Sequence, residues 1–178
     1  MGEVNEVKGG QVKSRVAKQP PTSIHAETTI LGAILLECSC ADKPEWIKQW
    51  EIAKILEPDD FCLESHRRIF LRMGELIDAG SQVDIVTLAN ELGRYKEVER
   101  IGGVAYLAGL TEGLPSRPFI RDYVKIVKAK SLLRKLIYSC STALEKAYDG
   151  ESGFKIIDAL KDQISEIEDV AKRGMRNA

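Results

Sequence analysis

The side chains of this sequence that could bind a metal are its cysteines and histidines. Cys38 and Cys40 are separated by one residue, and Cys62 and His66 follow downstream, which supplies four atoms of the type that zinc prefers. A one-residue gap is shorter than the usual gap of about two to four residues, and Cys62 and His66 lack the second close pair of a zinc finger. The spacing therefore favours Cys62 as a small apolar packing residue and His66 as a residue on a helix face.

The sequence does not indicate catalysis or a nucleotide-driven motor. A cysteine nucleophile needs a histidine base and a third group to orient it, and no third group is recognisable near His25 or His66. A P-loop, G-x-x-x-x-G-K-S/T, binds phosphates through backbone amides and a lysine. No Gly-Lys dipeptide and no G-x-G-x-x-G occurs in these 178 residues. We therefore expect no catalytic residue, no metal and no cofactor in this chain.

A run of positive charge extends from Arg121 to Lys135, where six Lys and Arg residues accompany one acid, Asp122. Such a run can bind DNA or an acidic partner protein. More often it is the solvated outer face of a helix, with counter-charges here on Glu166, Glu168 and Asp169 of the following helix. Few aromatic residues interleave with the run, so it does not predict a stacking platform for single strands. The candidates for a partner or DNA face are Arg121, Lys125, Lys128 and Arg134.

The composition describes a chain that can fold without metal or disulfide help. Acids and bases nearly cancel, to a formal net charge of -1, which argues against a general binder of polyanions. Without a secretory signal, the four cysteines are expected to be reduced. No apolar run approaches the ~20 residues that span a bilayer. We expect a soluble, cytoplasmic protein.

Apolar residues recur at helical spacing along most of the chain, and sustained period-two alternation is absent, so the sequence predicts an all-α fold. Residues 1–19 contain isolated valines, a Gly-Gly pair and scattered charge, which cannot offset the entropy cost of ordering them. We expect a flexible tail over 1–19, a globular multi-helix head over 20–116, a helical hairpin over 117–173 and a short tail over 174–178.

The predicted hairpin consists of two long amphipathic helices joined by a turn at 149–153. The first helix has no breaker from about 118 to 148, a length of ~46 Å at ~1.5 Å per residue. Its apolar residues Ile126, Leu133, Ile137, Cys140 and Leu144 recur at helical intervals and predict an internal seam. Apolar residues beyond that seam, among them Leu132 and Ile156, need another surface, which could be the head or a second hairpin. The candidates for self-association are Tyr123, Ile126, Val127, Leu133, Leu136, Ile137, Leu144, Ile157, Leu160, Ile164 and Ile167.

Five short patterns, in order, resemble the N-terminal domain of the DnaB family of hexameric replicative helicases. PTSIHAETTILG at 21–32 is similar to the family's P-x-S/T-x-E-A-E-x-S/A-V/I-L-G. The others are Asp60-Phe61 followed by His66, Ile69-Phe70 and Met73; VDIVTL at 83–88; Gly102-Gly103 with Tyr106-Leu107 and Leu110; and Tyr123, Ile126-Val127, Arg134 and Leu136-Ile137. Each matched residue also has a local structural reason: Gly32 permits close helix packing, for example, and Asp84 caps a helix. The patterns therefore indicate a fold and mark no catalytic site.

The sequence also departs from the family pattern. His25 replaces the first glutamate of E-A-E, and Cys62 replaces the aromatic residue after Asp-Phe. The segment 38–49 is longer than the family's usual connection and could form a lineage-specific surface. The ATPase domain that follows in the family is not in this sequence, so we expect DNA and ATP to be contacted only through that domain.

The resemblance implies a collar domain whose hairpins pair two subunits and build a trimer of dimers on a hexameric ring. It also implies docking of primase, and in some systems of the helicase loader. Three alternatives stay open at this point: a stand-alone adaptor, from a phage or mobile element, that captures helicase or primase; a DNA-binding regulator that uses the basic run; and a small enzyme that uses the Cys/His set.

Overall fold

The computed structural model describes residues 19–40, 46–114 and 119–176, and the side chains of 38–40, 46–48 and 172–176 are outside that description. Throughout the described ranges the chain is helical or irregular and contains no strand, so the predicted all-α fold is confirmed. Residues 1–18 of the predicted tail over 1–19 and residues 41–45 of the 38–49 segment lie outside the described residues. The helices are α1 (Ile24–Cys40), α2 (Trp46–Ala53), α3 (Glu64–Asp78), α4 (Ile85–Arg94), α5 (Gly103–Gly109), α6 (Arg121–Tyr148) and α7 (Gly153–Arg176), with 3-10 turns η1 (Pro58–Asp60) and η2 (Glu99–Ile101).

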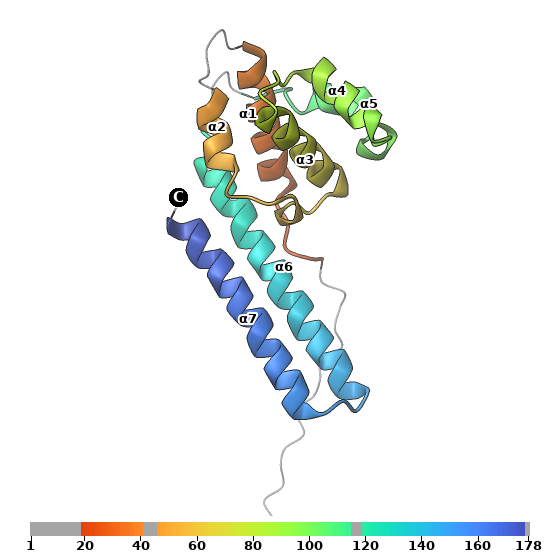
Figure 1. The fold of residues 1–178 in the computed structure, drawn as a ribbon, viewed down its shortest axis with the longest axis vertical. Coiled ribbons are helices and arrows are strands. Elements are labelled where there is room, and N and C mark those ends of the chain that lie inside the picture. The colour runs from red at the N-terminus through yellow and green to blue at the C-terminus, as the bar shows by residue number, and fades with distance from the viewer. Residues whose placement is uncertain (1–18, 41–45, 115–118, 177–178) are drawn as a thin grey trace, which may run out of the picture.

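Helices α1 to α5 form the head, and α1 lies at its centre (Figure 1). Ile30, Leu31, Ile34 and Leu35 of α1 are all buried, because apolar side chains on both sides of this helix meet neighbouring elements. An aromatic cluster belongs to the core of the head, where the ring centroids of Phe61 and Phe70 are 4.8 Å apart. Burying such side chains stabilises the fold by roughly 1.5–3 kcal/mol each.

Two residues that the sequence singled out have the predicted local roles. A Cβ added to Gly32 would lie 2.0 Å from the carbonyl oxygen of Leu110, so only glycine permits this close approach of α1. The Asp84 carboxylate accepts a hydrogen bond from the Thr87 amide at 2.8 Å, and the Thr87 hydroxyl accepts one from the Asp84 amide at 2.9 Å. This reciprocal cap starts α4 at Ile85.

Helices α6 and α7 run antiparallel and form the predicted hairpin, which projects from the head (Figure 1). The first half of α6 packs on α1, α2 and η1, and the rest runs beside α7 away from the head. Val124 and Val127 of α6 belong to the head's core. None of the described helices is long and apolar enough to cross a membrane.

Candidate functional site: a buried aspartate and an exposed helical stripe

Asp60 is the point at which the head and the hairpin are joined. Its carboxylate is fully buried and accepts hydrogen bonds from the Lys128 ammonium and the Ser131 hydroxyl of α6, each at 2.6 Å. The Lys135 ammonium lies 3.7 Å away. The Arg134 guanidinium donates to the backbone carbonyl oxygens of Asp60 and Pro21. We call Asp60, Lys128, Ser131, Arg134 and Lys135 the Asp60 hub.

The hub holds the Asp60 carboxylate in its charged form. Burial on its own raises the pKa of Asp60, because a charged group loses its hydration. Hydrogen bonds from Lys128, Ser131 and the Glu57 amide outweigh that effect and leave the pKa of Asp60 below its ordinary value. The hub is therefore a charged, directional contact inside an otherwise apolar junction.

A second buried network lies between α1, α3 and α5. The Glu27 carboxylate accepts the Cys62 amide at 2.8 Å and lies 2.7 Å from Nδ1 of His66. The other ring nitrogen of His66 lies 2.7 Å from the Tyr106 hydroxyl. Both ring nitrogens of His66 are thus engaged within the head. His66 lies on the buried face of α3, where Glu27 and Tyr106 satisfy its polar atoms.

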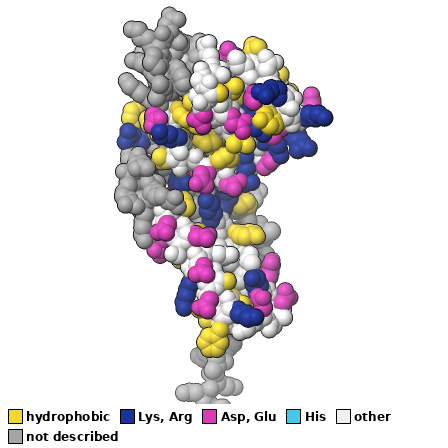
Figure 2. Space-filling view, viewed as in Figure 1, with side chains coloured by type: hydrophobic (Ala, Val, Ile, Leu, Met, Phe, Trp, Pro, Cys, Tyr) yellow, Lys and Arg dark blue, Asp and Glu magenta, His cyan; other side chains and the backbone are white. Residues whose placement is uncertain are grey.

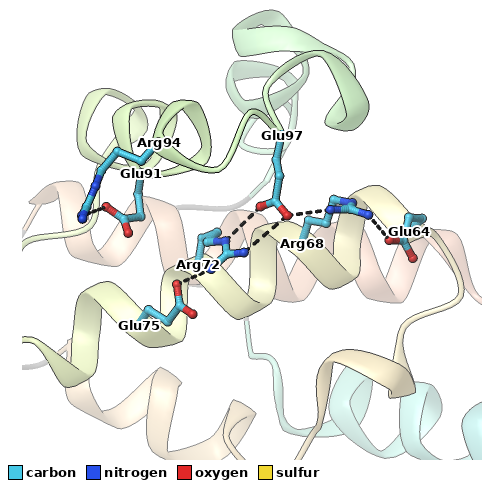
Figure 3. Close-up of polar contacts among 7 residues, drawn as sticks. All are labelled: Glu64, Arg68, Arg72, Glu75, Glu91, Arg94 and Glu97. Carbon is cyan, nitrogen blue, oxygen red and sulfur yellow. Dashed lines mark hydrogen bonds and ion pairs between the residues drawn. The ribbon is translucent and has the colours of Figure 1, made fainter.

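A third network joins α3 to the segment before η2 (Figure 3). Glu97 is buried and accepts hydrogen bonds from Arg72 and Arg68. The Arg72 hydrogen bond lowers the pKa of Glu97, more than burial raises it, and Glu97 in turn raises the pKa of Arg72. The Arg72 guanidinium also stacks 3.5 Å from the centroid of the Tyr95 ring. These contacts anchor α4 and η2 to α3 and present no open catalytic geometry.

The cysteines and histidines that were considered as metal ligands are not gathered into a site within the part of the chain that the structure describes. Across those residues, no three His, Cys, Asp or Glu side chains form a metal-binding group. Cys62 is half-buried, and the side chains of Cys38 and Cys40 lie outside the description. Both ring nitrogens of His66 already have partners, which leaves neither for a metal.

The structure divides the predicted basic face. Lys128 and Arg134 point into the hub and bond to the head, while Arg121 and Lys125 lie on the exposed side of α6. The counter-charge for Lys128 and Lys135 is Asp60. The sequence pattern could not reveal this pairing, because Asp60 and Lys128 are 68 residues apart. The four predicted residues therefore do not form one continuous face.

An exposed apolar stripe runs along α6. Ile126, Leu133, Ile137 and Leu144 are 41%, 47%, 50% and 38% exposed, and Cys140 of the same face is exposed too. We call these five residues the outer stripe. The prediction that they form the internal seam of the hairpin was wrong, because α6 turns Val124, Val127, Ser131 and Ser139 inward instead. Hydrophobic side chains are visible at the surface of the hairpin half of the molecule, down to its tip (Figure 2).

The other self-association candidates fall into three groups. Leu136 of α6 and Ile157 of α7 are exposed, and Leu160, Ile164 and Ile167 of α7 are half-buried. Val127 is buried, and Tyr123 packs on the head, with its ring edge-on to that of His25. Sequence reasoning missed three exposed aromatic residues, Tyr138, Tyr148 and Phe154, which are 70%, 81% and 85% exposed. A signal was available for two of them, because Tyr148 follows Leu144 by four residues and Phe154 precedes Ile157 by three, so both continue the apolar spacing.

The fold defines the class of the protein: an all-α domain with a compact head and a long helical hairpin. Residues 19–129 match the family model described as DnaB-like helicase N terminal domain, and the chain belongs to this family. The chain is 36% identical over 154 residues to the replicative DNA helicase DnaC of Bacillus subtilis (strain 168), covering 86% of this chain and 32% of the relative. It is 39% identical over 144 residues to the replicative DNA helicase DnaB of Geobacillus stearothermophilus, covering 81% and 29%. The chain thus spans about a third of the length of these relatives.

Two solved structures are similar to this one. The crystal structure of the N-terminal domain of DnaB helicase from Mycobacterium tuberculosis superposes with a TM-score of 0.72 at 30% identity, covering 83% of this chain and 99% of that one. A DnaB-like replicative helicase, described with its interactions with primase, superposes with a TM-score of 0.62 at 26% identity, covering 83% and 31%. Both matches support the head-and-hairpin architecture.

Replacing Asp60 by asparagine tests the hub. Asp60→Asn keeps the shape of the side chain but leaves Lys128 buried without its counter-charge, so we expect a loss of roughly 3–5 kcal/mol in the free energy of unfolding at pH 7. The folded-state pKa of Asp60 is lowered, so its contribution is complete above the unfolded pKa, near ~4, and is lost as pH falls through the folded value. The gap between wild type and Asp60→Asn should therefore shrink below about pH 4.

Urea unfolding from about pH 7 to about pH 3, a range that brackets the pKa of an unfolded aspartate, measures both effects. The matched control is Asp59→Asn, since the Asp59 side chain is 81% exposed and its loss should change stability by less than about 1 kcal/mol. A gap between Asp60→Asn and wild type that stays constant with pH would contradict the assignment of a charged Asp60.

Proposed function

We propose that this chain is the N-terminal collar domain of a replicative DNA helicase and that its hairpin pairs with the hairpin of a second copy. The observation that carries the proposal is the outer stripe. The aliphatic side chains of this stripe are exposed along α6, and the chain's own α7 does not cover them. A contiguous exposed apolar surface of this kind is typical of an interface. Pairing two copies would remove it from water.

The spacing of the stripe favours an antiparallel, two-fold arrangement. Its aliphatic residues are separated by seven, four and seven positions, from Ile126 through Leu133 and Ile137 to Leu144, so the pattern reads the same in both directions. A two-fold axis near residue 135 would oppose Ile126 to Leu144 and Leu133 to Ile137 of the second copy. Such an isologous interface uses the same surface on both subunits.

Docking of primase is the second part of the proposal, and docking of a helicase loader belongs to the same class of contact. Primase docking is supported by the similar helicase whose interactions with primase are described. Contacts with DNA and ATP are assigned to an ATPase domain beyond this sequence. The internal use of Lys128 and Arg134 in the hub counts against a DNA-binding regulator, whereas a stand-alone adaptor would use the same hairpin.

Charging the stripe tests self-association. Ile137→Asp places a carboxylate at the centre of the proposed interface, where an unpaired buried charge opposes association. Because Ile137 is half-exposed in the single chain, we expect a folded monomer by sedimentation velocity, with unchanged helicity by circular dichroism. Val86→Asp is the matched control, since Val86 is 68% exposed on the head. The pairing proposal fails if Ile137→Asp sediments as the wild type does.

Cross-linking tests the orientation. With the native cysteines replaced by serine, Ile126→Cys combined with Leu144→Cys should form a covalent dimer under oxidation. Ile126→Cys alone should not, because in an antiparallel pair the two copies of residue 126 are about 27 Å apart along the helix axis. Non-reducing electrophoresis separates the outcomes. Efficient cross-linking by the single variant would indicate parallel pairing instead.

The size of the native protein tests the helicase assignment. An antibody against this domain should detect, in source cells, a band well above the 19.8 kDa of this chain, and its immunoprecipitate should contain primase. A band at 19.8 kDa would support the stand-alone adaptor in place of the collar of a helicase.

A further inference from the structure

A cleft of about 660 Å³ lies where the head meets α6, at the edge of the outer stripe. Pro20, Asp59 and Arg67 line it from the head, and Arg134, Lys135 and Tyr138 from α6, where Ile137 and two serines complete the lining. Its volume is in the range of pockets that bind ligands or peptide side chains.

The cleft carries an excess of positive charge. Three of its lining residues, Arg67, Arg134 and Lys135, are cationic, and one, Asp59, is acidic. The buried acid beneath it does not remove the excess, because Asp60 is shared by two cations, Lys128 at 2.6 Å and Lys135 at 3.7 Å.

Two of these cations are partly exposed, and neither makes a close ion pair: Lys135 lies 3.7 Å from Asp60. The side chains of Arg67 and Lys135 are 36% and 31% exposed. Arg67 uses Nε to bond the Phe61 carbonyl, and its terminal nitrogen lies 3.9 Å from Asp59 and from Glu64, beyond hydrogen-bonding distance. An incoming carboxylate could take a direct hydrogen bond there.

The rim of the cleft is apolar and aromatic. Tyr138 is 70% exposed and Ile137 is 50% exposed, and Tyr and Arg are the residue types over-represented at the energetic centres of protein interfaces. Asp59 interrupts the positive charge at the same edge. A phosphate backbone carries a charge at every nucleotide and would meet Asp59, whereas a peptide can place a neutral residue there, which favours a protein partner over nucleic acid.

We propose that this cleft binds an acidic peptide segment of a partner protein, with one aromatic or aliphatic side chain against Tyr138 and carboxylates on Arg67 and Lys135. Ile137 is the one lining residue that the cleft shares with the outer stripe. The site does not depend on hairpin pairing, because its cations lie on the head and on the side of α6 that faces Asp60. It gives the domain a second docking surface that a single chain already presents.

The test is a titration of the isotope-labelled full chain with the capped peptide EDFEDL, followed by amide chemical shifts. We expect saturable shifts confined to residues 59–67 and 131–141, with weaker binding at higher salt. The neutral peptide QNFQNL should bind at least tenfold more weakly. Equal binding of the two peptides, or shifts that map elsewhere, would overturn the proposal.

Variants and a competing ligand complete the test. Lys135→Gln with Tyr138→Ala should weaken EDFEDL binding at least tenfold, while the matched pair Lys125→Gln with Tyr148→Ala, on the same helix outside the cleft, should change it less than twofold. Equal loss in the two pairs would overturn the site. If a twenty-nucleotide oligo-dT shifts the same amides at lower concentration than the peptide, the cleft is a nucleic-acid site and the proposal is wrong.

One more variant separates this proposal from hairpin pairing. Leu133→Asp lies on the outer stripe but outside the cleft lining, so it should dissociate the dimer and leave peptide binding intact. Loss of peptide binding in that monomer would mean that a second copy completes the cleft, which would overturn a site on the single chain. If Leu133→Asp remains a dimer, the result counts against pairing through the outer stripe and leaves the cleft proposal unaffected.

Discussion

The contact between Asp60 and α6 determines which way the long helix faces. Lys128, Ser131 and Lys135 recur at intervals of three and four and lie on one face of α6, where all three reach Asp60. At ~100° per residue, the aliphatic residues of the outer stripe lie roughly 170° around the helix from that face. The rotation that satisfies Asp60 is thus the rotation that turns the aliphatic stripe away from the head. A local electrostatic requirement thus determines which apolar face of α6 the domain exposes.

The position of Asp60 depends in turn on the head. The segment from Glu57 to Leu63 contains only the 3-10 turn η1, so many of its backbone groups need partners from elsewhere. Glu27 of α1 accepts the Cys62 amide, Arg67 donates to the Phe61 carbonyl, and Arg134 donates to the Asp60 carbonyl. Phe61 meanwhile fills the core below. Side chains from three helices therefore hold this segment, and Glu27 bonds both His66 and the backbone next to Asp60–Phe61.

The sequence predicted the fold well because helices are encoded locally. Periodicity, the Asp84 cap and the turn at 149–153 identify helices from neighbours in the chain, and the order of short patterns identified the head. It predicted the surfaces poorly, since these depend on rotation. Nothing local distinguishes the stripe through Ile126 and Ile137 from an internal seam, because both are apolar at the same spacing. Lys128 likewise reads as part of a solvated charge run until the fold of the head brings Asp60 to it. The sequence grouped the residues of the outer stripe correctly on one face of α6, but it assigned that face to the inside of the hairpin and not to its exposed surface.

A charged hub suits this junction better than an apolar one for a reason of specificity. Helix α6 carries apolar side chains on two opposite faces, Val124 and Val127 on one and the outer stripe on the other. An apolar socket on the head would accept either face with similar free energy, because the hydrophobic effect has no direction. With Asp60 in the socket, rotating α6 by half a turn would place the aliphatic side chains of the outer stripe against the Asp60 carboxylate and move Lys128 into solvent. The buried Asp60 would then have no counter-charge, which costs several kcal/mol. The Asp60–Lys128 pair need not increase the free energy of unfolding to select this rotation. What matters is the difference in free energy between the two ways of packing α6 on the head. The pair keeps the stripe uncovered in the single chain, as the pairing proposed above requires.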